Sequence, residues 1–133
     1  MNRLAVLILS LAFSFPVMAS DDSEQKPIQH LEIADVTSLE DAKRIFVETT
    51  AEIRSKQKLD PAELQQIHII TYSLEKSVAY FVENTDGERH ELAEEIAEVV
   101  EEIHLSSENN RQEETKEHLK EYFDMADRFT AGF

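Results

Sequence analysis

Cysteine is absent from this chain of 133 residues. Its absence excludes a disulfide framework, a thiol nucleophile and the C-x-x-C-H attachment site of a c-type haem. Glycine is scarce too, with two residues, and the sequence contains no Gly-rich phosphate loop, no G-x-S-x-G elbow and no H-E-x-x-H pair. We therefore expect a protein that is not an enzyme and that is stabilised by a packed apolar core.

Basic residues are also few. The chain has 13 Lys and Arg against 28 Asp and Glu, which gives a formal net charge of −15 at pH 7. An anionic surface of this kind repels nucleic acid and acidic lipid headgroups. We expect neither as a partner.

The N-terminus has the pattern of a secretory signal peptide. A short segment with a positive charge at Arg3 precedes the apolar run Leu4–Phe15, and small residues lead up to a cleavage site after Ala19. A membrane-spanning helix would need about 20 apolar residues, and this run is shorter. We predict a signal peptide over residues 1–19, a periplasmic or secreted protein, and no membrane span after cleavage.

Residues 20–37 are predicted to form a short extended arm. Pro27 disfavours helix at the residue before it. The apolar residues of the segment follow no helical period. The folded domain is therefore expected over residues 38–133.

Four helical segments are predicted in that domain. Ser38 and the Asp60–Pro61 pair are typical of helix starts, and Asn84–Gly87 is typical of a turn between two helices. Ser106–Ser107 is interpreted as a further interruption, with the last helix beginning at about Glu108. Each segment carries an apolar stripe at spacings of three and four, and no alternating strand pattern occurs. The predicted fold is all-α, an up-down-up-down four-helix bundle.

Two of the five histidines attract attention, because imidazole is a common metal ligand. If the second and third helices form an antiparallel hairpin about Thr85, a rise of about 1.5 Å per residue places His68 at nearly the height of His104. A divalent transition metal such as copper, zinc or nickel would accept imidazole together with carboxylate. The acids considered for the remaining ligand are Glu101, Glu63 and Glu102.

A structural interpretation of the same histidines stays open. Each follows an apolar stripe residue, so each could be a hydrogen-bonded residue at the edge of the core, with Tyr72 one turn from His68 as its partner. The E-x-x-H spacing of bundle metal sites occurs once, at Glu101 and His104, whereas a di-iron site needs it twice.

The stretches IHIITYSLEKSV (residues 67–78) and EEIHLSSE (residues 101–108) resemble a family of small exported bacterial proteins of unknown function. The order of segments is similar as well: signal peptide, polar arm, an SLEDA-like first helix, a His-Tyr helix and a Glu-Ile-His helix. The resemblance implies that histidines comparable with His68 and His104 recur in the family, and it implies no activity. The arm departs from the family form at residues 31–34, where a glycine is expected.

The sequence thus predicts a non-enzymatic, exported helical-bundle protein without a cofactor, acting as a binding or accessory protein of the cell envelope. A protein partner would dock on exposed apolar residues, for which Tyr80 and an outward-facing Tyr72 are the candidates. The alternative is a periplasmic metal-binding protein that uses His68, His104 and Glu101.

Overall fold

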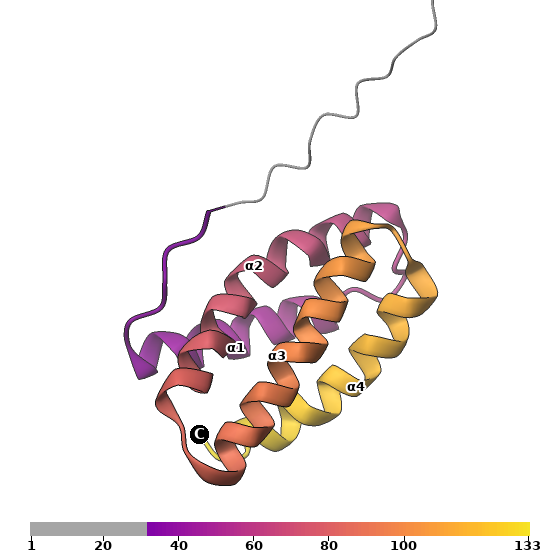
Figure 1. The fold of residues 1–133 in the computed structure, drawn as a ribbon. Coiled ribbons are helices and arrows are strands. Elements are labelled where there is room, and N and C mark those ends of the chain that lie inside the picture. The colour runs from indigo at the N-terminus through magenta and orange to yellow at the C-terminus, as the bar shows by residue number, and fades with distance from the viewer. Residues whose placement is uncertain (1–31) are drawn as a thin grey trace, which may run out of the picture.

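The computed structural model describes residues 32–133, and in this range it contains four helices and no strand. They are α1 (Leu39–Arg54), α2 (Pro61–Asn84), α3 (Gly87–Glu108) and α4 (Gln112–Thr130). Consecutive helices pack side by side, and α4 also packs against α1 (Figure 1). The predicted four-helix bundle is confirmed. Within residues 32–133, no helix combines the length and the apolar character needed to cross a membrane.

The predicted signal peptide and most of the predicted arm lie outside the described residues. The described part of the arm, residues 32–37, has no regular secondary structure before α1 begins. The Asp35 carboxylate pairs with the Lys76 ammonium on α2, and Val36 packs against the core. This hydrogen-bonded ion pair raises the pKa of Lys76. The last residues of the arm therefore lie along α2.

Helices α1 and α2 start at the predicted caps. The Ser38 hydroxyl accepts the backbone N–H of Asp41 at 3.2 Å, and the Asp60 carboxylate accepts that of Glu63 at 2.9 Å. The Glu63 carboxylate in turn accepts the two backbone N–H groups that precede Asp60, each at 2.8 Å. The turn between α1 and α2 is therefore held by side chains of the helix that it leads into.

The predicted break at Ser106–Ser107 is wrong. Helix α3 continues through both serines to Glu108, and α4 begins at Gln112. Both serines are buried, and each hydroxyl donates to a carbonyl one turn earlier, at 3.3 and 3.0 Å, so neither competes with the helix. The chain turns instead at Asn110, whose φ of +56° is a left-handed conformation that asparagine tolerates better than most residues.

At one end of the bundle, aromatic rings fill the core. The rings of Phe46, Phe81 and Phe129 pack edge to face or tilted, with centroids 4.9 to 6.0 Å apart. All three are at most 1% exposed. A buried polar contact joins α1 to α4, where the Tyr122 and Thr50 hydroxyls lie 2.6 Å apart. Burial raises the pKa of the Tyr122 hydroxyl well above its ordinary value.

Candidate functional site

Helices α2 and α3 bring three rings together on the side of the bundle. His68 and Tyr72 lie one turn apart on α2, and His104 faces them from α3. The ring centroids are 4.8 Å apart between the two histidines, 5.3 Å between His68 and Tyr72, and 4.9 Å between Tyr72 and His104. The exposed fractions are 4%, 8% and 6% for His68, Tyr72 and His104. We call these three residues the ring cluster.

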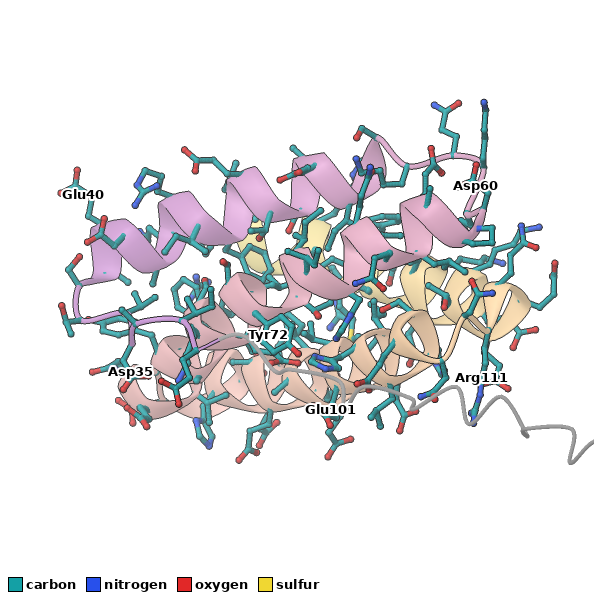
Figure 2. The ribbon with its side chains drawn as sticks, turned by 90° about the horizontal axis from the view of Figure 1, so that it is seen from above. Asp35, Glu40, Asp60, Tyr72, Glu101 and Arg111 are labelled. Carbon is teal, nitrogen blue, oxygen red and sulfur yellow. The ribbon has the colours of Figure 1, made fainter. Side chains whose placement is uncertain are left out.

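The hairpin explains this convergence. Helix α2 ends at Asn84 and α3 begins at Gly87, so the two helices are antiparallel and turn where the sequence predicts. Residues at similar distances before and after the turn lie at similar heights, because both helices rise by about 1.5 Å per residue. Figure 2 shows Tyr72 near the middle of the bundle, well away from the ends marked by Asp60 and Asp35. The predicted meeting of His68 with His104 is confirmed in its geometry.

Hydrogen bonds orient both imidazoles. The His68 Nε2 atom lies 3.2 Å from the Tyr72 hydroxyl. The His104 Nδ1 atom lies 2.7 Å from a carboxylate oxygen of Glu75 and 3.2 Å from the Thr71 hydroxyl. Because a carboxylate accepts, Nδ1 of His104 carries a proton, and a neutral ring then has its lone pair on Nε2. A carboxylate that binds one imidazole nitrogen in this way is the usual companion of a metal-binding histidine.

Glu108 adds a carboxylate to this side of the bundle. One ligand atom from each of His68, His104 and Glu108 lies within 4.8 Å of the other two. Glu108 follows His104 by four residues on α3, which places both side chains on one face of the helix. Two donors bound to one ion at about 2.0 to 2.1 Å lie about 3.3 Å apart in a tetrahedral site. The donor atoms, which lie up to 4.8 Å apart here, would have to approach one another to bind one ion. A change in the side-chain torsions of the partly exposed Glu108 is the simplest movement that brings its carboxylate closer.

The acids considered from the sequence lie elsewhere. Glu101 is exposed on α3, where Figure 2 shows it at the edge of the bundle. With Glu75 it lines a groove of about 250 Å³ between α2 and α3, which is also lined by Ala79 and Ala97. Glu63 binds the turn before α2, and a Glu102 oxygen lies 4.0 Å from His118. Glu101 as a ligand stays a prediction, and Glu108 is the acid that the geometry groups with the histidines.

Two contributors were missed from the sequence, Glu108 and Glu75. The His104–Glu108 spacing of four was visible, but the false break at Ser106–Ser107 placed Glu108 in another helix. Glu75 lies almost two turns beyond His68 on α2 and reaches His104 only because the two helices cross closely there. Such a contact depends on helix rotation, which spacing alone does not give.

The other described histidines take no part in the ring cluster. His90 lies near the start of α3, where its Nδ1 is 2.9 Å from the Val82 carbonyl and its Nε2 is 3.2 Å from Glu94. His118 is on α4. His30 lies outside the described residues. The two partly exposed histidines therefore serve as controls for the buried pair.

Comparison with known proteins identifies a family but no activity. The sequence model of a family described as "Family of unknown function (DUF6746)" matches residues 1–131. No curated protein and no solved structure matches the chain. The resemblance to a family of unknown function is thereby confirmed.

Proposed function

Since the chain belongs to the DUF6746 family, whose function is unknown, we propose from the geometry of its site that the protein binds a divalent transition metal ion between α2 and α3. The proposed ligands are His68, His104 and Glu108. The proposal is carried by two buried imidazoles whose ring centroids lie 4.8 Å apart. The Glu108 carboxylate lies within 4.8 Å of a ring nitrogen of each. Two imidazoles with one carboxylate form a set that zinc, copper and nickel accept.

Burial and polarity support this proposal over a purely structural role. His68 and His104 are 4% and 6% exposed, and their rings lie against each other beside the Glu108 carboxylate. Glu75 orients the imidazole of His104 through Nδ1, as the outer partner of a metal-binding histidine commonly does. Glu108 is only partly buried, so its side chain is in contact with solvent at the edge of the site. The proposed role is binding of the ion, without catalysis.

A calorimetric titration tests the proposal. The purified protein is titrated with Zn(II), Ni(II) and Cu(II), beside the variant His68→Ala/His104→Ala. The matched control is His90→Ala/His118→Ala, which removes as many imidazoles from outside the ring cluster. The proposal predicts binding at micromolar or tighter Kd in the wild type and in the control, and its loss in the first variant.

Folding must be separated from ligation in this test, because His68 and His104 are buried. Circular dichroism checks each variant, and Glu108→Gln supplies a milder change at a partly exposed position. We expect Glu108→Gln to fold as the wild type does and to bind the ions more weakly. Binding that survives in both the double variant and Glu108→Gln would leave the ring cluster with a structural role only.

A role through protein contacts is the second proposal, for an exported accessory protein of the cell envelope. Tyr72 is buried and Tyr80 half-buried, so the expected docking residues are not the exposed ones. Ile69 and Leu105 are 46% and 42% exposed, and each directly follows a histidine of the ring cluster. Crosslinking in cells tests this proposal, because a specific partner would be lost in Ile69→Glu/Leu105→Glu.

A further inference from the structure

The Tyr72 hydroxyl lies beside one of the donors of the proposed metal site. It lies 3.2 Å from Nε2 of His68, and its ring packs edge to face on His104. Tyr72 and His68 are four residues apart on α2, so a single helical turn holds both donors in place. The tyrosine is 8% exposed, and its hydroxyl is within hydrogen-bond distance of the His68 imidazole.

We propose that Tyr72 is a further ligand of the ion, as a phenolate, and that the site is therefore built for Cu(II). This inference rests on the metal site proposed above. Two donors that bind one ion at about 2 Å each are separated by about 2.8 Å at a right angle and about 3.3 Å at the tetrahedral angle. The observed separation of 3.2 Å between the hydroxyl oxygen and Nε2 of His68 lies between these values. An ion can thus take the place of the shared proton without movement of α2.

The chemistry is a proton exchange without redox change. The oxygen–hydrogen bond of Tyr72 breaks, an oxygen–copper bond forms, and the proton leaves to solvent. The double charge of the ion stabilises the phenolate in this buried place, as a bound cation commonly does for an acidic ligand. Two imidazole nitrogens and two anionic oxygens, from Tyr72 and Glu108, make a nitrogen–oxygen set that suits tetragonal Cu(II) or Ni(II), and Cu(II) binds such a set more tightly than Ni(II) does.

The visible spectrum of the copper-loaded protein tests this inference. A phenolate bound to Cu(II) gives a charge-transfer band in the visible range, which imidazole and carboxylate do not give. We expect this band in the wild type and its loss in Tyr72→Phe. Tyr80→Phe is the matched control, because Tyr80 is two turns further along α2 and outside the ring cluster. Tyr72→Phe removes one hydroxyl and keeps the ring, so the packing against both histidines is preserved.

Two further readouts distinguish a ligand from a packing residue. Calorimetry in buffers of different ionisation enthalpy should show about one proton fewer released per copper in Tyr72→Phe. Loss of a direct ligand should weaken Cu(II) binding by at least about tenfold, since even outer partners of ligands are worth that much. The affinity for Zn(II) should fall less in Tyr72→Phe, because zinc binds well to three protein ligands and a water molecule.

The outcomes separate this inference from the proposal on which it rests. Tight Cu(II) binding that depends on His68 and His104, but gives no phenolate band, would overturn the role of Tyr72 and leave the metal site standing. A band retained in Tyr72→Phe would overturn it as well. Absence of any binding that depends on the histidines would remove both the site and its fourth ligand.

Discussion

Replacing Glu75 by glutamine should weaken metal binding although Glu75 does not touch the ion. Its carboxylate lies 2.7 Å from Nδ1 of His104, and the side chains are 31% and 7% exposed. Removing such a partner of a metal-binding histidine typically costs about 10- to 100-fold in affinity. That range corresponds to about 1.4 to 2.8 kcal/mol. Because Glu75 is partly exposed and glutamine can still accept a hydrogen bond, we expect the lower end, about tenfold.

Glu101→Gln is the matched control for this experiment. It removes the same charge from the same groove, and Glu101 is exposed on α3. General attraction of a cation to this acidic side of the protein should therefore change equally in both variants. The affinity for Zn(II) is measured by competition with a chromophoric chelator at fixed ionic strength. Equal effects of the two changes would refute an orienting role of Glu75, and a larger effect of Glu101→Gln would restore Glu101 as a ligand.

Three other predictions concern the fold. Phe46→Ala should lower the free energy of unfolding by about 3 to 5 kcal/mol, because Phe46 is fully buried; Val47→Ala, at 48% exposure, should cost less than about 0.5 kcal/mol in the same urea titration. Burial raises the pKa of Tyr122 above its ordinary value of 10.0. The neutral hydroxyl therefore contributes fully to the free energy of unfolding below about pH 10, and this contribution is lost as the pH rises further. Tyr122→Phe should accordingly be less stable than the wild type at pH 7, by about 1 kcal/mol, and this deficit should shrink in urea titrations above pH 10. Asn110→Ala should cost about 1 kcal/mol because φ is positive there, whereas Asn110→Gly should not; thermal unfolding in which both behave alike would contradict this.

The overall fold was predictable because its signals are local. Caps at Ser38 and Asp60 depend on one side chain and the N–H of a residue three positions later, and the structure contains both contacts. The apolar stripes determine which face each helix buries. The end of α3 was not predictable in this way. A serine pair can cap the start of a new helix, or its hydroxyls can donate to carbonyls of the helix that contains them. Because Ser106 is buried beside Thr115, the pair takes the second arrangement and α3 continues.

The candidate site was predictable only in part. The positions of His68 and His104 relative to the hairpin turn, with the rise per residue of a helix, are enough to predict that the two lie at the same height. The rotation of each helix about its axis decides which acids join them, and it is set by packing across the whole bundle. The E-x-x-H spacing favoured Glu101, whereas the structure places Glu75 against His104 and groups Glu108 with both imidazoles.

The location of a bound ion would test the proposed metal site most directly. Crystals of the protein grown with Zn(II) would be measured at the zinc absorption edge, and an anomalous difference map calculated. We predict one strong peak between α2 and α3, within about 2.0 to 2.2 Å of a nitrogen from each of His68 and His104 and an oxygen of Glu108. Peaks only on exposed glutamates of α3, or no peak beside the two imidazoles, would contradict the proposed metal site.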